Sequence, residues 1–383
     1  MADPAILYGN FNNQEREWFL NTFINIQSPE TMKKIIFDCE RMKYPDTGLY
    51  HYCRNLGKYL EKNIRLQNEQ LFFYTPPGEQ DWSYSNANHI TQNPLHKFVL
   101  PPFSSFDIWH ATYQNTHYMP LLNKKIRVVL SVHDLNFLYD EKKSGSKKQK
   151  YLRYLQGLIN RADAIVCISE FSKKDVLQHC DIKNKPLYVI HNGSNLLLSP
   201  GLTAKSYKPK KPFLFSIGVM NRKKNFHVLL PLLKSNTMEL LIAGKNDDAN
   251  YRYFIEERSR ELGVESNVRL LGSITETEKS WYFNNCRAFA FPSISEGFGL
   301  PVLEAMSCGK PLFLSDRTAL PEIGGDAAFY FRDFNADHMQ QVFNSGMKKY
   351  TANGLSEMIK ERGHSFCWHK SASEYLDVYR SLY

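Results

Sequence analysis

The chain has 383 residues, 43% of them hydrophobic and 23% charged, which is enough for two globular domains that each bury a core. No stretch approaches the roughly 18 uncharged apolar residues that cross a bilayer, so the sequence predicts a soluble or peripheral protein. The formal net charge of +9 attracts phosphates, anionic lipid headgroups or nucleic acid, and charge alone does not choose among these partners.

The compartment is predicted from the N-terminus and the cysteines. The first residues have neither a basic start nor an apolar core of secretory type, and the seven cysteines form no CxxC pair. We therefore expect a cytoplasmic protein with reduced, structural thiols. The densest basic runs, residues 141–150 and 205–211, lie in loop-like sequence and are interpreted as solvated surface.

Short β-branched or aromatic runs alternate with amphipathic stretches, which is typical of parallel sheets flanked by helices. The predicted strands of the first half are Ile35–Asp38, Leu71–Tyr74, Arg127–Val132, Ala164–Ile168 and Leu187–Ile190. Those of the second half are Phe213–Ile217, Glu239–Ala243, Val268–Leu271, Ala288–Phe291 and Leu312–Ser315. A stretch rich in Gly, Ser, Pro and Lys separates the two series, as a linker does. We predict a first domain over residues 1–197, a linker over 198–212, a second, Rossmann-like domain over 213–365 and a terminal helix over 366–383.

The most informative stretch is residues 293–315, SISEGFGLPVLEAMSCGKPLFLS. It predicts a glycine loop with Gly297 and Gly299, then a short helix that begins near Pro301. Backbone amides at such a helix start bind a diphosphate. Glu304, in the first helical turn, can accept hydrogen bonds from a ribose diol, and Glu296, in the loop, can reach the sugar beyond the phosphates. The bland alternative is that Glu304 complements the helix dipole and Glu296 caps a turn.

A second stretch, residues 213–230, reads as an apolar strand that stops at Gly218 before an amphipathic helix that starts near Asn225. Arg222, Lys223 and Lys224 precede this helix. Cations at a helix N-terminus oppose the helix dipole, so their presence indicates a bound anion, and we expect a pyrophosphate. An ordinary solvated turn is the alternative.

These motifs resemble glycosyltransferase family 4, whose members have the GT-B fold and a Glu-x7-Glu element. The resemblance rests on SEGFGLPVLEAMSCGKP and ALPEIGGDAAFYF, and extends to SIGVMNRKKN, IVCISEFSKKDV, YVIHNG, SVHDLNFLYD and DTGLYHYCRNLGKYL. It implies two Rossmann-like β/α/β domains that face each other across a cleft. It also implies that the C-terminal helix, which resembles the family's closing helix, crosses back to the first domain.

The resemblance assigns roles to individual residues. It implies that Glu304 contacts the ribose, that Glu296 contacts the transferred sugar and that Lys224 binds the diphosphate. Lys223 or Arg222 would make the second phosphate contact. The remaining donor-binding positions implied are Gly48, Gly218, Gly297, Phe298, Gly299 and Leu300.

The remaining polar residues of interest also have purely structural interpretations. The resemblance places His133 in the active site, whereas by itself a His-Asp pair after a strand is a turn capped by Asp134. His110 follows a short apolar strand and could line the cleft. Glu322 matches a family position, but we expect it to fix a loop by hydrogen bonds. The tandem Asp247 and Asp248 is not interpreted as a metal site.

The resemblance implies a retaining, metal-independent transferase without a cofactor, in which a donor phosphate oxygen takes the acceptor proton. GDP-mannose is favoured over UDP-hexoses as donor. The expected acceptor is a glycan or lipid-linked glycan of bacterial surface polysaccharide synthesis, with peripheral membrane association. Residues 81–93 could line the sugar cleft or form loops. A nucleotide-sugar epimerase, a phosphorylase of the same fold and a non-catalytic nucleotide-sugar or polyanion-binding protein are the alternatives. No basic stripe interleaved with aromatic residues indicates nucleic acid.

Overall fold

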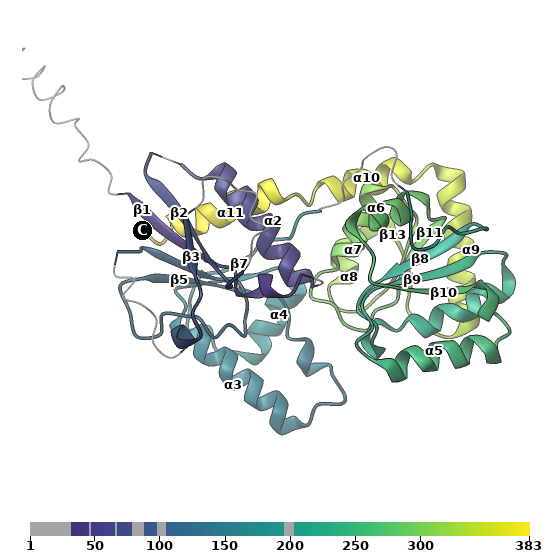
Figure 1. The fold of residues 1–383 in the computed structure, drawn as a ribbon, viewed down its shortest axis with the longest axis horizontal. Helices are drawn as coiled ribbons and strands as arrows, with labels where there is room; N and C mark the ends of the chain where they lie inside the picture. The colour runs from purple at the N-terminus through teal and green to yellow at the C-terminus, as the bar shows by residue number, and fades with distance from the viewer. Residues whose placement is uncertain (1–31, 46, 66, 79–87, 98–104, 195–202) are drawn as a thin grey trace, which may run out of the picture.

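Two parallel sheets, each flanked by helices, form two domains joined by a returning C-terminal helix (Figure 1). The computed structural model describes residues 32–45, 47–65, 67–78, 88–97, 105–194 and 203–383. In the described residues the first sheet has the strand order β3-β2-β1-β4-β5-β6-β7, and the second has the order β10-β9-β8-β11-β12-β13. The prediction of two Rossmann-like domains is confirmed. The predicted boundary at residues 197 and 198 lies outside the described residues.

The elements of the first domain are β1 (Lys33–Asp38), η2 (Glu40–Lys43), α2 (Gly48–Asn63), β2 (Glu69–Thr75), β3 (Asn88–Thr91), η3 (Pro94–Lys97), β4 (Ile108–Ala111), β5 (Arg127–Val132), η4 (Asn136–Leu138), α3 (Gly145–Arg161), β6 (Ala164–Cys167), α4 (Glu170–His179) and β7 (Leu187–Val189).

Those of the second domain are β8 (Phe213–Ile217), η5 (Arg222–Lys224), η6 (Phe226–Ser235), β9 (Glu239–Ala243), α5 (Ala249–Glu261), η7 (Glu265–Asn267), β10 (Val268–Gly272), α6 (Glu276–Asn285), β11 (Ala288–Phe291), α7 (Leu300–Ser307), β12 (Leu312–Ser315), α8 (Leu320–Gly324), η8 (Gly325–Ala327), β13 (Ala328–Phe331), α9 (Ala336–Asn353) and α10 (Ser356–His364). The chain ends with α11 (Trp368–Arg380).

The predicted strands match the observed ones closely, and the differences in the described residues are three short strands outside the predicted series and one helix. Strand β3 was not predicted because its sequence, NHIT, contains no apolar run. Strand β13, with the sequence AFYF, was missed because a four-residue apolar run does not by itself distinguish a strand from a buried helix segment. Strand β4 was expected only as the short apolar strand before His110, and it includes that histidine. Residues 81–93 were expected to line the sugar cleft or to form loops, and their described part forms β3 and the loop after it. The helix expected from Asn225 is the 3-10 helix η6, which contains Pro231. Proline removes a backbone donor and clashes with the preceding turn, so a regular α-helix does not form there.

Helix α11 returns to the first domain and packs against α2 (Figure 1). Its Tyr375 hydroxyl lies 2.7 Å from that of Tyr52 on α2 and 2.8 Å from the Ser131 hydroxyl on β5. Near its end, Arg380 forms a bidentate ion pair with the buried Glu69, at 2.8 and 2.9 Å. Because these partners are buried in the first domain, the terminal helix is an integral layer of that domain.

Apolar residues from both domains join in one core. Phe298, Phe366 and Trp368 connect the α2–α11 side of the first sheet to the α6–α7 side of the second. Among the residues described, no helix combines the length and the apolar character needed to cross a bilayer.

Replacing Tyr379 with Phe should destabilise the chain. The Tyr379 hydroxyl lies 2.6 Å from Nδ1 of the fully buried His110, and its loss leaves that nitrogen without a partner. We expect a loss of about 1–3 kcal/mol in the free energy of unfolding, measured by urea titration.

Tyr253→Phe is the matched control, because Tyr253 is 60% exposed, and its effect should stay within about 0.5 kcal/mol. Equal stability of Tyr379→Phe and wild type would show that this bond does not hold α11 in place.

Candidate active site

Both sheets reverse their strand order at one point, and the loops at these two points line one cavity. The reversal lies between β1 and β4 in the first sheet and between β8 and β11 in the second. Parallel sheets bind ligands in the crevice outside the carboxyl ends of the strands at such a reversal. The cavity has a volume of about 880 Å³. Its walls include residues 47–51 and 113–115 from the first domain, and residues 217–219 and 296–301 from the second.

Lys224 and Glu296 form an ion pair on the wall of the second domain, with Nζ 2.6 Å from Oε1. The lysine side chain lies across Gly218, where an added Cβ would meet Cε of Lys224 at 2.9 Å. Burial opposes the charge on the Glu296 carboxylate, but the ammonium groups of Lys224 and Lys223 outweigh it and lower its pKa. The wall therefore presents an ionised carboxylate and an ammonium group side by side.

The loop before α7 approaches the first domain at backbone distance. A Cβ on Gly297 would lie 2.4 Å from the carbonyl oxygen of His133, so any side chain would push the loop away. Gly299, with a φ of +111°, occupies the N-cap position of α7, and Pro301 stands in the first turn. The predicted order of glycine loop and helix start is confirmed, and residues 297–301 at this start line the cavity.

Glu304 lies in the second turn of α7, not in the first as predicted from Pro301. Its Oε1 is 2.6 Å from Nζ of Lys279 on α6, and this ammonium also lies 2.8 Å from Glu276. Burial disfavours the charged lysine, but the two carboxylates outweigh it and raise the pKa of Lys279. Sequence reasoning missed Lys279. Lys279 is the fourth residue of α6, and a single lysine at the start of a helix resembles, more weakly, the basic run before a helix that pointed to Lys224.

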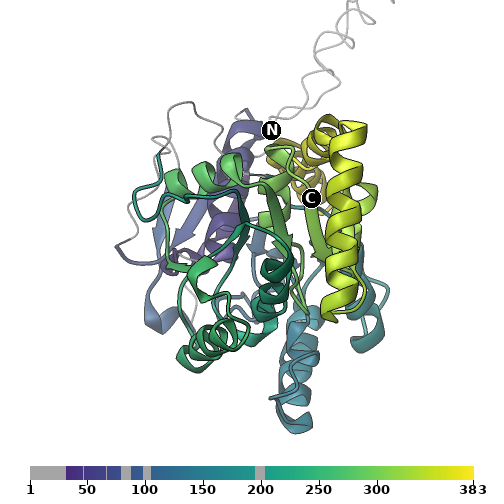
Figure 2. The ribbon, with the colours of Figure 1, turned by 90° about the vertical axis from the view of Figure 1, so that its right-hand side faces the viewer.

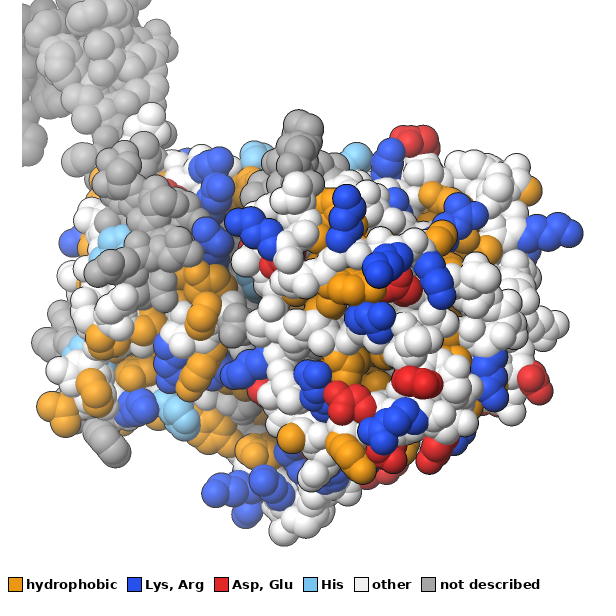
Figure 3. Space-filling model, turned by 45° about the vertical axis from the view of Figure 1, so that its right-hand side comes forward, with side chains coloured by type: hydrophobic (Ala, Val, Ile, Leu, Met, Phe, Trp, Pro, Cys, Tyr) orange, Lys and Arg blue, Asp and Glu red, His pale blue; other side chains and the backbone are white. Residues whose placement is uncertain are grey.

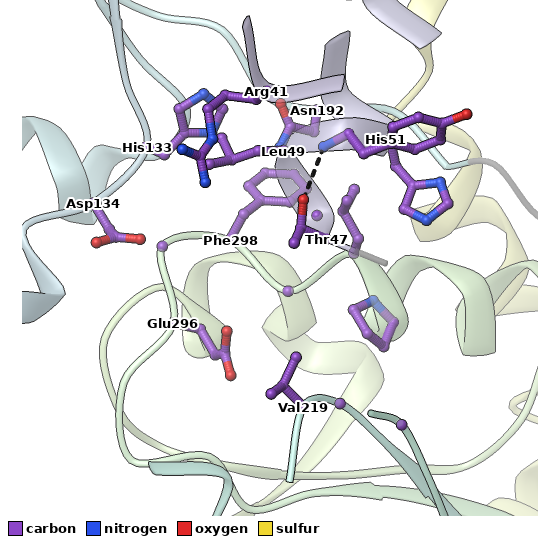
Figure 4. Close-up of a pocket in the computed structure, with 18 of the residues that line it drawn as sticks. Arg41, Thr47, Leu49, His51, His133, Asp134, Asn192, Val219, Glu296 and Phe298 are labelled. Carbon is purple, nitrogen blue, oxygen red and sulfur yellow. Dashed lines mark hydrogen bonds between the residues drawn. The ribbon is translucent and has the colours of Figure 1, made fainter. Parts of the chain in front are cut away.

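His133 and Asp134 lie on the opposite wall, facing Glu296 (Figure 4). Nε2 of His133 donates to the carbonyl oxygen of Thr112 at 2.8 Å, which leaves Nδ1 as an acceptor. Burial lowers the pKa of His133 to about 4, so the ring is neutral at pH 7. Asp134 accepts a hydrogen bond from the backbone of Asn136 at 2.9 Å. Asp134 thus caps the turn, as the bland alternative predicts, and also lines the cavity.

His110 does not line the cavity, which corrects the expectation from its place after an apolar strand. It lies within β4, where side chains alternate between the two faces of the sheet, and it points to the α11 face. There it contacts Ser131 at 2.7 Å and Tyr379 at 2.6 Å. Its role is to hold the buried polar network that fixes the terminal helix.

The structure separates the three neighbouring cations of η5. Lys224 enters the cavity, whereas Arg222 and Lys223 are exposed and lie outside its lining. The Arg222 guanidinium lies 5.0 Å from the ring centre of Phe254 on α5, away from the cleft. Lys223 still acts through its charge, because it adds to the effect of Lys224 in lowering the pKa of Glu296. Burial raises the pKa of Asp134, and the charge of Lys223 offsets part of this rise. Of the two candidates for a second phosphate contact, the placement favours Lys223.

Glu322 acts through hydrogen bonds, as expected, but it holds the start of a helix and not a loop. Its two carboxylate oxygens accept hydrogen bonds from the backbone of Glu170 at 2.8 Å and Phe171 at 3.1 Å, at the start of α4 in the other domain. Asp248 caps α5 through the backbone of Tyr251 at 3.0 Å, and Asp247 lies 3.6 Å from Lys245. These contacts account for both aspartates as a helix cap and a surface ion pair.

Several cavity residues carry no motif in the sequence. The Arg41 guanidinium lies 4.7 Å from the ring centres of both Tyr44 and Tyr113 and faces the cavity beside His133 (Figure 4). Thr47 caps α2 by accepting a hydrogen bond from Tyr50 at 3.3 Å. Thr47 lies in the stretch DTGLYHYCRNLGKYL, which the sequence analysis noted, but it was not singled out there. Arg41 lies outside all the quoted motifs, and only the fold brings it to the cavity.

Family models match both domains of this chain. Residues 203–365 match the model described as "Glycosyl transferases group 1", and residues 51–196 match "Glycosyltransferase Family 4". The chain belongs to the family 4 glycosyltransferases.

Two curated relatives give this glycosyltransferase its context. It is 25% identical to the O-antigen chain mannosyltransferase B of Escherichia coli over 401 residues, which cover 91% of this chain and 100% of that protein. It is 24% identical to the O-antigen chain mannosyltransferase RfbU of Salmonella typhimurium, over 63% of this chain and 70% of that one. The glycosyltransferase is thus similar to enzymes of polysaccharide synthesis.

A solved structure supports the fold. Anabaena HepE, in complex with UDP and glucose, superimposes with a TM-score of 0.67 at 16% identity, over 90% of this chain and 100% of that one. The GT-B fold implied by the sequence motifs is confirmed.

Replacing Gly297 with Ala should weaken nucleotide binding by this glycosyltransferase. The added Cβ clashes with the His133 carbonyl, so the loop and the start of α7 must shift. We expect at least about a tenfold loss of affinity, equal to about 1.4 kcal/mol, in calorimetric titration with UDP, GDP and ADP. Gly157→Ala is the control, since a Cβ there meets nothing within 4 Å. Unchanged affinity of Gly297→Ala would contradict a role for this close approach.

The stability of the enzyme should fall as the pH drops from about 6.5 to about 4, partly because of His133. Its pKa in the folded state lies below that of the unfolded chain, so the unfolded state binds the extra proton in this window and is favoured there. His133→Gln should reduce the slope of unfolding free energy against pH by up to about 1.4 kcal/mol per pH unit. An unchanged slope in urea titrations across this range would show that His133 does not titrate as inferred.

Proposed function

We propose that this glycosyltransferase transfers a hexose, with retention of configuration, from a nucleotide diphosphate sugar to a glycan or lipid-linked glycan of bacterial surface polysaccharide synthesis. The observation that carries the proposal is the meeting of Lys224, Glu296 and the amides before α7 in one cavity, opposite His133. The cavity thus contains cationic and backbone donors for a diphosphate beside carboxylates for sugar hydroxyls.

The donor is bound on the wall of the second domain. Glu304 accepts hydrogen bonds from the ribose hydroxyls, and Lys279 beside it keeps this carboxylate oriented. Lys224, aided by the charge of Lys223, and the amides between Gly297 and Leu300 bind the diphosphate. Gly218 and Phe298 form the surface below the diphosphate. Gly48 approaches from α2 of the first domain, and a Cβ added to it would lie 4.0 Å from Cδ1 of Leu300.

The chemistry depends on stabilising the leaving diphosphate. The ammonium of Lys224 and the preorganised amides lie where negative charge grows as the glycosidic bond breaks, and this is where electrostatic preorganisation contributes most. These groups replace a divalent cation in the proposal. No cofactor is involved.

Retention is proposed to occur by attack from the front face. The acceptor hydroxyl bonds to the anomeric carbon on the side that the diphosphate leaves, and a donor phosphate oxygen takes its proton. His133, neutral and with Nδ1 free to accept, bonds a hydroxyl of the transferred sugar. Glu296 orients this sugar and is not a nucleophile, since its carboxylate is engaged by Lys224.

The names of the relatives favour mannose as the transferred sugar, because two O-antigen mannosyltransferases align with this chain. We keep GDP-mannose as the proposed donor, ahead of UDP-hexoses. The acceptor enters from the first domain, whose wall carries Arg41, Tyr113 and Asp134. We place the reaction at the cytoplasmic face of the plasma membrane, where lipid-linked glycans are extended.

A donor screen tests the proposal. The protein is incubated with UDP-, GDP-, ADP- and dTDP-sugars in the presence of EDTA, and release of nucleoside diphosphate and thermal shift are followed. We expect one donor to be hydrolysed and to raise the Tm. Glu304→Gln should lower the turnover by about 10²-fold or more, because the ribose contact and the pairing with Lys279 both weaken.

Glu357→Gln on α10 is the matched control, since the Glu357 side chain is 75% exposed and lies outside the cavity lining. Binding without turnover for every donor and acceptor tried would favour a non-catalytic nucleotide-sugar-binding protein. No thermal shift with any nucleotide would mean that the cavity is not a donor site.

A further inference from the structure

A rigid loop of the first domain presents two adjacent leucines to solvent. Leu121 is 54% exposed and Leu122 is 95% exposed. The buried Arg161 holds this loop from beneath. Its Nε donates to the carbonyl of Pro120 at 2.7 Å, and one Nη donates to Asn123 and Ile126, both at 2.7 Å. The leucines are therefore exposed by a fixed backbone and cannot fold back into the core.

Basic residues surround this loop. Lys124 and Lys125 follow the leucines and are exposed. The neighbouring Asp163 is already paired with Arg161 at 3.2 Å and Arg127 at 3.0 Å. Residues 142–161, which include α3, contain seven basic residues and no acidic one. This part of the chain includes most of the basic run that the sequence analysis interpreted as solvated surface.

The loop and the basic face of α3 lie on the same side of the molecule. Tyr154, within α3, donates to the carbonyl of Thr116 at 2.6 Å. Arg161, at the end of α3, donates to the carbonyls of Pro120 and Asn123, which flank the two leucines. Lys147 and Lys150 precede Tyr154 by seven and four residues, which places them on the same helix face. Figures 1 and 2 show α3 projecting from the first domain, and Figure 3 shows Lys and Arg side chains at the lower end of the molecule as well as over the rest of that face.

This strip leads from the leucine loop to the mouth of the cavity. Lys143, just before α3, and Tyr151, within α3, line the cavity itself. A planar anionic surface laid against the strip would therefore reach the acceptor side of the cleft.

We propose that Leu121, Leu122 and the basic face of α3, with Lys147 and Lys150, form a docking surface for an anionic lipid bilayer. The leucines enter the headgroup–acyl boundary, and the lysines bind anionic headgroups. Two adjacent exposed leucines favour a bilayer over a nucleic acid, because a polyanion offers them no apolar environment. The inference rests on the proposed function for its purpose, which is to hold the cleft next to a lipid-linked acceptor.

Vesicle co-sedimentation tests the surface, with no nucleotide sugar present. Vesicles of phosphatidylcholine alone are compared with vesicles that also contain phosphatidylglycerol, at low and high salt. We expect binding to the anionic vesicles only, weakened by salt. Leu121→Ser with Leu122→Ser, and separately Lys147→Glu with Lys150→Glu, should each lower the partition coefficient at least about tenfold.

Matched controls lie in the second domain. Tyr253→Ser removes a 60% exposed aromatic side chain, and Lys348→Glu with Lys349→Glu reverses two exposed charges on α9. Both should bind vesicles as the wild type does. All variants should bind nucleoside diphosphate normally, which also shows that they fold.

Two outcomes would overturn the inference. The first is equal binding to neutral and anionic vesicles or an equal loss in the controls. The second is a loss caused by the charge reversal but not by the leucine substitutions, which would indicate a polyanion-binding surface. A protein that binds vesicles but fails the donor screen contradicts only the proposed function, whereas one that passes the screen without binding vesicles contradicts only the docking surface.

Discussion

The cleft depends on a close approach between the backbones of the two domains. Gly297 lies against the His133 carbonyl, and hydroxyl groups of the first domain bond both residues. Ser169 donates to the Gly297 carbonyl at 2.8 Å, and Ser172 donates to the His133 carbonyl at 2.7 Å. The contacts of Gly297 and His133 are buried, and they involve only backbone atoms and short serine side chains. They therefore restrict the movement of the loop that contains Gly297. Their geometry sets His133 opposite Lys224.

Two other connections support the same approach. Glu322 accepts backbone hydrogen bonds at the start of α4, so a carboxylate of the second domain completes a helix of the first. Helix α11 leaves the second domain and packs on the first, where Tyr375, Tyr379 and Arg380 find buried partners. The domains therefore meet at the loop beside the cavity and through the returning helix, while the cavity between them stays open.

The charges of the donor wall are already paired before a ligand binds. Glu296 with Lys224 and Glu304 with Lys279 are both at 2.6 Å, and all four side chains are largely buried. Removing one member of such a pair leaves a buried charge without compensation, which is costly. A diphosphate that enters the cavity must share Lys224 with Glu296. In the proposed function, these pairs keep the ionised groups compensated until the donor binds.

The sequence by itself determined the two Rossmann-like domains, most strands and the glycine loop before α7, because apolar periodicity and the Gly-Pro signals around Gly299 and Pro301 are local. It also identified Lys224, Glu296 and Glu304 as cavity candidates, since their motif lies within one strand-loop-helix unit. The tertiary structure decided the rest. His110 faces α11 because strand alternation, not chain order, sets its direction. Lys279 and Arg41 reach the cavity from separate elements, and contacts between elements distant in sequence leave no local pattern to detect.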